Sequence, residues 1–244
     1  MQSAGSYNIS EVTKLIRRIF VGTILIEGIG ALILTNEFYK LGCSNHDALY
    51  KGIFHSISAF CNAGIDIIAE NSLCNYATNP LINIVTSALI ILGGLGYIVW
   101  WDALRVVKSR SPKNRKIFRH LTLHSKIAIT VTAGLILVGA LLIFVFEYSN
   151  PLTIGEMSLF DKIQVSFFQS VTTRTAGFAT VPQENLTNAS ATVSIILMLF
   201  GGSPVGTAGG MKTVTIAVLI CSATSSIGIV LHMSAIALDN LRFG

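Results

Sequence analysis

The feature that most constrains this chain is a series of long apolar runs. Residues 127–146 carry no ionisable side chain, over a length close to the roughly 20 residues that cross a bilayer. Comparable runs cover residues 16–34 and 81–101, and a fourth, interrupted by glycines, begins at Ala191. Only 12% of the 244 residues are charged, too few for the polar surface of a soluble domain. We therefore expect an all-α membrane protein in which each of the first three runs forms one spanning helix.

Basic residues predict how the chain is oriented. The connection between the second and third runs is rich in Lys and Arg, whereas residues 35–80 and 147–190 hold few basic residues among many acids. The basic residues of the middle connection are Arg105, Lys108, Arg110, Lys113, Arg115, Lys116, Arg119 and Lys126. Because Lys and Arg are retained in cytoplasmic loops, we expect residues 105–126 inside and the two other connections outside. The net charge of +5 is then a topology signal, and we expect no nucleic-acid partner.

The N-terminus is expected in the cytoplasm. Lys14 and Arg17 precede or open the first apolar run, and no small-residue cleavage pattern follows it, so the run does not resemble a signal peptide.

The four cysteines do not suggest a metal or redox site. Cys43, Cys61, Cys74 and Cys221 show neither CxxC spacing nor neighbouring histidines, so we expect no transition metal. Cys43 and Cys74 share the first outer connection, where an oxidising compartment would allow a disulfide. Two free thiols are the favoured alternative.

The sequence contains an internal repeat at a shift of 113 residues. Residues 54–66 read FHSISAFCNAGID, and residues 167–179 read FFQSVTTRTAGFA. The alignment pairs Ala63 with Ala176 and Gly64 with Gly177. An inner connection joins the two copies, so they have the same orientation and form parallel repeats. We expect the first repeat in residues 1–119 and the second in residues 120–244.

Each repeat contains a short segment between its two apolar runs. Residues 48–60 and 160–173 are too short to span a membrane but long enough for a re-entrant helix, and a glycine-containing turn follows each. Non-helical backbone at membrane depth is tolerated only where it lines water or protein. Backbone carbonyls there can replace the water shell of an alkali cation, and glycine allows the positive φ angles that orient them. The candidate ion-facing residues are Cys61, Asn62, Ala63, Gly64, Arg174, Thr175, Ala176 and Gly177.

Residues 201–213, GGSPVGTAGGMKT, interrupt the last apolar run. Gly206, Lys212 and Thr213 fit three positions of the phosphate-binding pattern GxxxxGK[ST], but Met211 stands where the pattern needs glycine, so we expect no nucleotide site. A helix kink filled with small residues for close packing is one explanation of the segment. A functional loop is the other.

Three polar residues at membrane depth need an explanation. Glu27 is expected to face the protein interior, without an identifiable partner. Arg174 is expected to brace its turn rather than to contact a cation, because like charges repel. Lys212 suits either an electrostatic obstacle within a pore or an anchor at the cytoplasmic end of its helix.

The segments SAFCNAGID, SVTTRTAGFATV and GGSPVGTAGGMKTVT resemble the second and third pore-loop repeats, and the following loop, of Trk/Ktr potassium transporters. The resemblance covers residues 16–219, with departures at Cys61 and Ile65, where the family usually has Asn and Phe. It implies residence in a bacterial plasma membrane, four repeats around one pore, a homodimer, and a cytosolic nucleotide-binding ring partner of the KtrA/TrkA type. It also implies a gating loop whose candidate residues are Gly201, Gly202, Ser203, Gly206, Thr207, Gly209, Gly210 and Lys212.

Three classes of function compete. The preferred one is a translocation subunit that passes K+, with Na+ as a second candidate ion, through a carbonyl-lined filter without a bound cofactor. An intramembrane enzyme is the second class, for which His55, Ser56 and Asp66 gather near the first turn but lack counterparts in the second. The third is a non-conducting assembly subunit or an incomplete fragment, because only two repeats are present. We expect a transporter and not an enzyme.

Overall fold

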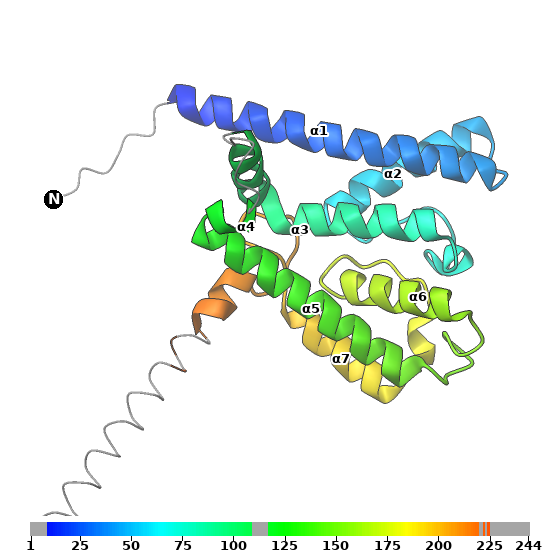
Figure 1. The fold of residues 1–244 in the computed structure, drawn as a ribbon. Coiled ribbons are helices and arrows are strands. Elements are labelled where there is room, and N and C mark those ends of the chain that lie inside the picture. The colour runs from blue at the N-terminus through cyan, green and yellow to red at the C-terminus, as the bar shows by residue number, and fades with distance from the viewer. Residues whose placement is uncertain (1–8, 109–116, 220–221, 223, 225–244) are drawn as a thin grey trace, which may run out of the picture.

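The structure, a computed structural model, describes residues 9–108, 117–219, 222 and 224. Its described part is helical, and three long helices lie side by side with shorter ones between and behind them (Figure 1). The elements are α1 (Ile9–Lys40), α2 (Asn45–Phe60), η1 (Cys74–Tyr76), α3 (Pro80–Lys108), α4 (Ile117–His120), α5 (Leu123–Glu147), α6 (Leu159–Thr172), η2 (Gln183–Asn185) and α7 (Asn188–Leu199). Residues 213–219 are again helical. The predictions for Arg110, Lys113, Arg115, Lys116 and Cys221 concern positions outside the described residues.

Within the described residues, three helices are long and apolar enough to cross a membrane: α1, α3 and α5. Apolar side chains point outward along α1 and α5, as lipid-facing helices require. Helix α7 is apolar but shorter. The predicted all-α membrane fold is thus confirmed.

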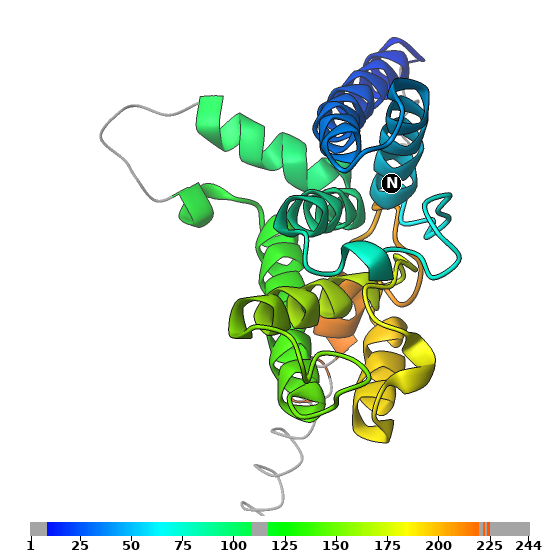
Figure 2. The same ribbon diagram turned by 90° about the vertical axis from the view of Figure 1, so that its right-hand side faces the viewer.

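Each repeat has the order long helix, short helix, turn, second helix. In Figure 2, α1 and α2 of the first repeat lie above α3, and α5, α6 and α7 of the second repeat lie below it. Serine caps begin both short helices: Ser44 Oγ accepts a hydrogen bond from Asp47 N at 3.3 Å, and Ser158 Oγ accepts one from Asp161 N at 3.2 Å. An N-cap of this kind satisfies a free amide of the first turn.

Each short helix attaches to the preceding long helix through a serine hydroxyl. Ser56 Oγ donates to the Glu27 carbonyl at 2.7 Å, and Ser170 Oγ donates to the Ile136 carbonyl at 2.8 Å. At the 113-residue shift that aligns the two turns, Glu27 of α1 pairs with Ala140 of α5. The acid at position 27 is therefore specific to the first repeat.

A carboxylate near the end of each long outer helix holds the start of the second helix. In the first repeat, Glu37 Oε1 accepts from Asn79 Nδ2 at 3.0 Å, and Asn79 caps α3. In the second, Glu147 Oε1 accepts from the backbone N and the hydroxyl of Thr187, the N-cap of α7, at 2.9 and 2.7 Å. The two links close each repeat at the same end.

A third carboxylate joins the two repeats. Asp102, near the end of α3, accepts from the backbone N and the hydroxyl of Thr122, both at 2.8 Å, and Thr122 caps α5. Arg105 also contacts Asp102, at 2.5 Å.

The run of residues 81–101, predicted to be one spanning helix, lies within α3, which is long and apolar enough to cross a membrane. Helix α3 is kinked at Gly96, whose φ of 75° and ψ of 162° are not helical. A Cβ at this position would lie 2.8 Å from both Val205 O and Gly206 N. The glycine-rich loop therefore packs directly against the kink, and that contact requires a residue without a side chain.

The kink leaves carbonyls of α3 without their helical partners, and other groups satisfy them. The Leu92 carbonyl accepts from the indole of Trp100 at 2.9 Å. The Gly93 and Gly94 carbonyls accept from backbone amides of the glycine-rich loop at 3.0 and 2.8 Å. Buried carbonyls need such partners, so the break in α3 and the loop are one structural unit.

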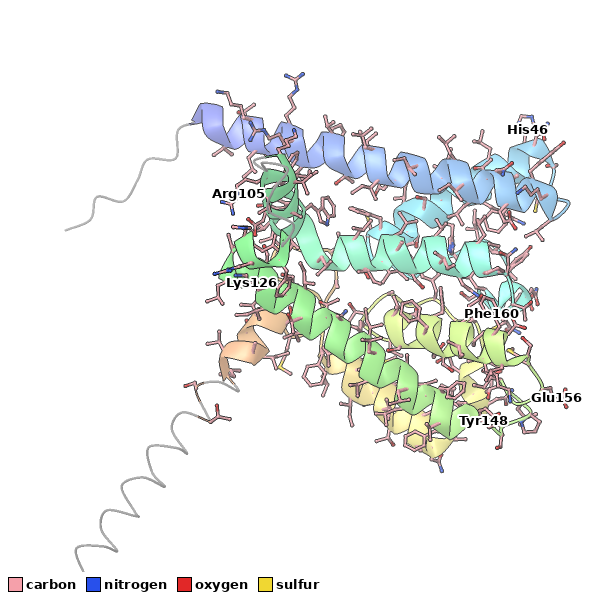
Figure 3. All side chains as sticks on the ribbon, in the orientation of Figure 1. His46, Arg105, Lys126, Tyr148, Glu156 and Phe160 are labelled. Carbon is pink, nitrogen blue, oxygen red and sulfur yellow. The ribbon has the colours of Figure 1, made fainter. Side chains whose placement is uncertain are left out.

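The main apolar core lies where the two repeats meet, with contributions from α1, α2, α3, α5 and α6. Phe178 of the second repeat packs on His55 of the first, with ring centroids 4.6 Å apart. Figure 3 shows that the ends of the molecule differ: Arg105 and Lys126 lie at one end, and His46, Glu156 and Phe160 at the other. The basic end corresponds to the predicted cytoplasmic side.

Candidate ion-binding turns and the glycine-rich loop

The first turn, residues 61–66, follows the C-terminal end of α2. Asn62 and Gly64 have positive φ angles of 52° and 66°, whereas Ala63 between them does not. Positive φ at alternate residues allows backbone carbonyls of the turn to be directed to one side, where they could face a cation. Such backbone suits a site in which main-chain dipoles face an ion.

The second turn, residues 174–179, repeats this backbone. Thr175 and Gly177 have φ angles of 68° and 91°, and they are the residues that the 113-residue shift pairs with Asn62 and Gly64. Positive φ is uncommon for a residue such as Thr. Its recurrence at an equivalent position indicates that both turns are built for the same backbone geometry.

Hydroxyl groups from the short helices hold the far side of each turn. Ser58 Oγ donates to the Ile65 carbonyl, and Thr172 Oγ1 donates to the Phe178 carbonyl at 2.7 Å. The two acceptors are equivalent in the repeat alignment. In the other direction, the backbone N of Ala63 donates to the Ser58 carbonyl, and the backbone N of Ala176 donates to the Thr172 carbonyl, both at 2.9 Å.

The two turns meet at their glycines. A Cβ on Gly64 would lie 2.6 Å from the Cα of Gly177, and one on Gly177 would lie 2.9 Å from the Cα of Gly64. Beside this contact is a hollow of about 410 Å³ whose lining includes Ala63, Thr175 and Ala176. The structure thus brings the predicted residues of the two repeats together.

The glycine-rich loop, residues 201–213, contacts the first turn through Thr207. Thr207 Oγ1 donates to the Phe60 carbonyl at 2.8 Å and accepts from Asn62 Nδ2 at 2.6 Å. Its backbone N donates to Gly93 of α3 at 3.0 Å. One residue of the loop therefore joins α2, α3 and the first turn.

The loop also contacts the second turn. Gly209 N donates to Thr175 Oγ1 at 2.9 Å, and Arg174 Nη2 donates to the Gly201 carbonyl at 2.9 Å. Arg174 is only 7% exposed and follows the C-terminal end of α6, where the helix dipole favours a cation. In the described part of the chain no acid forms an ion pair with it. Its hydrogen bonds run to the loop and, at 3.4 Å, to Thr132.

Between the two turns lies a very small cavity of about 10 Å³, lined by Asn62 and Arg174 among others. Asn62 Oδ1 and Arg174 Nε are buried and have no hydrogen-bond partner within the described residues. The cavity is about the size of one water molecule. Asn62 Oδ1 is an acceptor and Arg174 Nε is a donor, so a water molecule in this cavity could bridge them.

The structure supplies the partner of Glu27 that the sequence did not reveal. Cys61 Sγ lies 3.9 Å from Glu27 Oε1 and is placed to donate to it. Lys212 is half-buried and donates to the Ala208 carbonyl at 2.7 Å, within the loop. The described cysteines, Cys43, Cys61 and Cys74, are free thiols.

Of the candidate enzyme residues, His55 and Ser56 are directed to different partners. His55 Nε2 lies 3.1 Å from Thr86 Oγ1, while the Ser56 hydroxyl is directed to the Glu27 carbonyl. His55 and Ser56 therefore serve helix packing rather than each other.

The fold and the paired turns define a helical membrane protein with tandem pore-loop repeats. The chain belongs to the TrkH family of cation transport proteins, whose family model matches residues 4–243. This family consists of transporters and not enzymes.

Relatives support the same family. The chain is 37% identical over 212 residues to the potassium/sodium uptake protein NtpJ of Enterococcus hirae, covering 86% of this chain and 44% of that protein. It is 36% identical over 215 residues to the Ktr system potassium uptake protein B of Bacillus subtilis, covering 88% and 46% of the two chains. The chain thus spans less than half the length of these relatives.

A solved structure with the same fold is the potassium transporter TrkH from Vibrio parahaemolyticus. The TM-score is 0.68 at 19% sequence identity, and the similarity covers 94% of this chain and 44% of that one.

Proposed function

We propose that this chain is part of the translocation subunit of a Trk/Ktr-type potassium uptake system, to which it contributes two of four filter quarters. The observation that carries the proposal is the meeting of two equivalent turns at Gly64 and Gly177, each with alternating backbone hand. Residues 1–119 and 120–244 are the corresponding repeats. Two further quarters come from sequence beyond these residues or from another chain.

The transported ion is K+, held by backbone carbonyls of the two turns. Carbonyl oxygens replace the water shell of K+ without a fixed charge, so neither a cofactor nor a transition metal has a role. The proposed ion-facing backbone is that of residues 61–64 and 174–177. Na+ is the second candidate ion, since one relative is named a potassium/sodium uptake protein. Arg174 serves through its backbone, while its side chain braces the glycine-rich loop.

The glycine-rich loop acts as the gate. Its position supports this role, because it lies against both turns and is joined to them through Thr207 and Gly209. Its many glycines lower the cost of changing backbone conformation. The loop residues proposed to move are Gly201, Gly202, Ser203, Gly206, Thr207, Gly209, Gly210 and Lys212. Close packing of small residues is the alternative explanation, and the loop's contact with Gly96 favours neither.

The subunit is proposed to lie in the bacterial plasma membrane with its basic end in the cytoplasm. Arg105 and Lys126 lie at that end (Figure 3), as the retention of positive charge in cytoplasmic loops requires. A homodimer and a cytosolic nucleotide-binding ring of the KtrA/TrkA type are the proposed partners. The Ktr system named for one relative is consistent with several components.

A non-conducting assembly subunit is the second candidate. Potassium flux in proteoliposomes separates the two. A purified four-repeat transporter that contains this chain should carry K+ and should lose its preference for K+ when Gly64 or Gly177 is replaced. Transport that does not depend on either glycine would favour the assembly role.

A further inference from the structure

We infer that Thr207 is a positioning residue that couples the glycine-rich loop to the ion-facing backbone, so that displacement of the loop changes ion selectivity together with flux. The inference rests on the proposed function and adds a specific link between gate and filter. Thr207 itself lies outside both turns. Its effect on an ion would therefore pass through the residues that it contacts.

The Thr207 hydroxyl both donates and accepts a hydrogen bond. It donates to the Phe60 carbonyl at 2.8 Å and accepts from Asn62 Nδ2 at 2.6 Å. A threonine hydroxyl has one hydrogen to donate and accepts others through its lone pairs. Both contacts therefore form at the same time, and the hydroxyl links the end of α2 to the first residue of the turn that has positive φ.

The hydrogen bond to Thr207 helps to hold Asn62 in an unfavourable backbone conformation. Its φ of 52° is a conformation that Asn tolerates better than most residues but that still costs free energy. Its Nδ2 has only longer alternatives, at 3.4 Å to Phe60 O and 3.4 Å to Ile90 O. The bond to Thr207 is the short one, so the loop helps to hold the first turn in its ion-facing shape.

The second turn is linked to the loop at the equivalent position. Thr175, which the repeat pairs with Asn62, also has positive φ and accepts from Gly209 N at 2.9 Å. Gly209 is two residues from Thr207. A single movement of this short stretch would thus release both left-handed residues, which is the reason to expect a change of selectivity and not of flux alone.

Thr207 also cannot move without changing its contact with α3. Its backbone N donates to the Gly93 carbonyl at 3.0 Å, beside the kink at Gly96. Gly93 in turn lies against Phe60 O so closely that a Cβ there would overlap it. The latch formed by Thr207, Asn62 and Phe60 is therefore built into the junction of α2, α3 and the loop.

The test uses the four-repeat transporter in proteoliposomes, with potassium and sodium fluxes measured on the same preparation. Thr207→Val removes the hydroxyl, and Thr207→Ser keeps it. Thr192→Val is the matched control, because the exposed Thr192 donates only within α7, to Asn188 O at 2.8 Å. We expect Thr207→Val to raise potassium flux roughly fivefold or more, since two lost hydrogen bonds favour the open loop, and to lower the K+/Na+ ratio. Thr207→Ser should lie closer to the parent in both readouts, and Thr192→Val should match the parent.

Other results for Thr207→Val would contradict the inference in different ways. A higher flux with an unchanged K+/Na+ ratio in Thr207→Val would overturn the coupling while leaving the gate intact. Unchanged potassium flux and an unchanged K+/Na+ ratio in Thr207→Val would show that the hydrogen bonds of Thr207 do not hold the loop in place. Failure of the proposed function is recognised separately, by a parent without potassium flux or by deletion of residues 206–210 without effect.

A second route avoids variants that fail to fold. Thr207→Cys, in a protein whose native cysteines are replaced, is purified folded and then modified with a small thiol reagent, with the cysteine-free parent treated in parallel. Modification should raise flux and lower the K+/Na+ ratio only in Thr207→Cys. Complete modification that leaves the ratio unchanged would overturn the inference.

Discussion

Gly64 and Gly177, from equivalent positions of the two repeats, touch backbone to backbone. Neither can carry a Cβ, because one at Gly64 would lie 2.6 Å from Gly177 Cα and one at Gly177 would lie 2.9 Å from Gly64 Cα. Both residues also have positive φ, at 66° and 91°. The contact fixes how the two turns face each other.

Replacing either glycine with serine should impair ion discrimination more than abundance. The added Cβ disfavours positive φ and separates the two turns, so the carbonyls lose their geometry toward K+. We expect Gly64→Ser and Gly177→Ser in the four-repeat transporter to lower the K+/Na+ flux ratio. Gly134→Ser in α5 is the control, because nothing lies within 4 Å of a Cβ there. If both turn variants keep the parental ratio, the filter assignment is wrong.

Glu147 should be important for stability rather than for selectivity. Its carboxylate is 1% exposed and accepts from Asn150, Thr153 and both donors of Thr187, at 2.6–2.9 Å. Glu147→Ala removes the acceptor of the buried Thr153 hydroxyl and of both half-buried Thr187 donors, a loss on the order of 3 kcal/mol of unfolding free energy. Thermal unfolding of the purified protein in detergent measures it.

The matched control for this loss is Glu156→Ala. Glu156 is exposed in the connection between α5 and α6, at the end of the molecule marked in Figure 3, so its removal should leave the unfolding temperature unchanged. Equal stability of Glu147→Ala and Glu156→Ala would contradict the helix-linking role. A K+/Na+ ratio that changes in folded Glu147→Ala would place the residue in the ion path instead.

Deletion of residues 206–210 should raise potassium flux in the four-repeat transporter. The deletion removes Thr207 and Gly209, which join the loop to the two turns, and thereby opens the path that the loop obstructs. Flux is compared with that of the parent at equal reconstituted amounts. A folded deletion variant whose flux is unaltered or reduced would favour the packing explanation of the loop.

Thiol labelling of intact cells tests the orientation of the chain in the membrane. The rate at which Cys74 is labelled should also depend on pH. An impermeant reagent should reach Cys74 from outside and should not reach a cysteine introduced at Asn114, which lies outside the described residues. Burial raises the pKa of the Cys74 thiol, and Glu184 and Asp66 raise it further. The reactive thiolate is therefore scarcer at neutral pH, and the labelling rate should keep rising with pH beyond the usual range of a thiol. Outside labelling at position 114 would reverse the proposed topology.

Local sequence signals were enough to predict much of this fold. Apolar length placed the long helices, and the short helices α2 and α6 begin and end within a few residues of the predicted segments. The aligned Ala-Gly pairs identified the two turns. Such features depend on hydrophobic length and on residues that tolerate unusual backbone, both of which can be read from neighbouring positions.

Features set by distant contacts could not be predicted in this way. The loop around Gly206, far along the chain, packs against α3 at the kink at Gly96, whereas a glycine inside an apolar run is by itself compatible with a continuous helix. The partners of Glu27 and Glu147 likewise come from other elements. The three closely spaced glycines Gly93, Gly94 and Gly96 were the one available signal of a close approach.

The most direct test of the central claim compares residues 1–244 alone with a version extended to four repeats, each reconstituted in liposomes. Filter backbone cannot remain exposed to hydrocarbon, where each unsatisfied polar group costs several kcal/mol, so two quarters should not form a conducting pore. We predict K+-selective flux from the four-repeat protein and none from monomeric residues 1–244; flux from a dimer of the short chain alone would indicate a pore shared by two chains. Robust K+-selective flux from the monomeric short chain, or no potassium flux from the four-repeat protein, would contradict the claim that these turns are two quarters of a potassium filter.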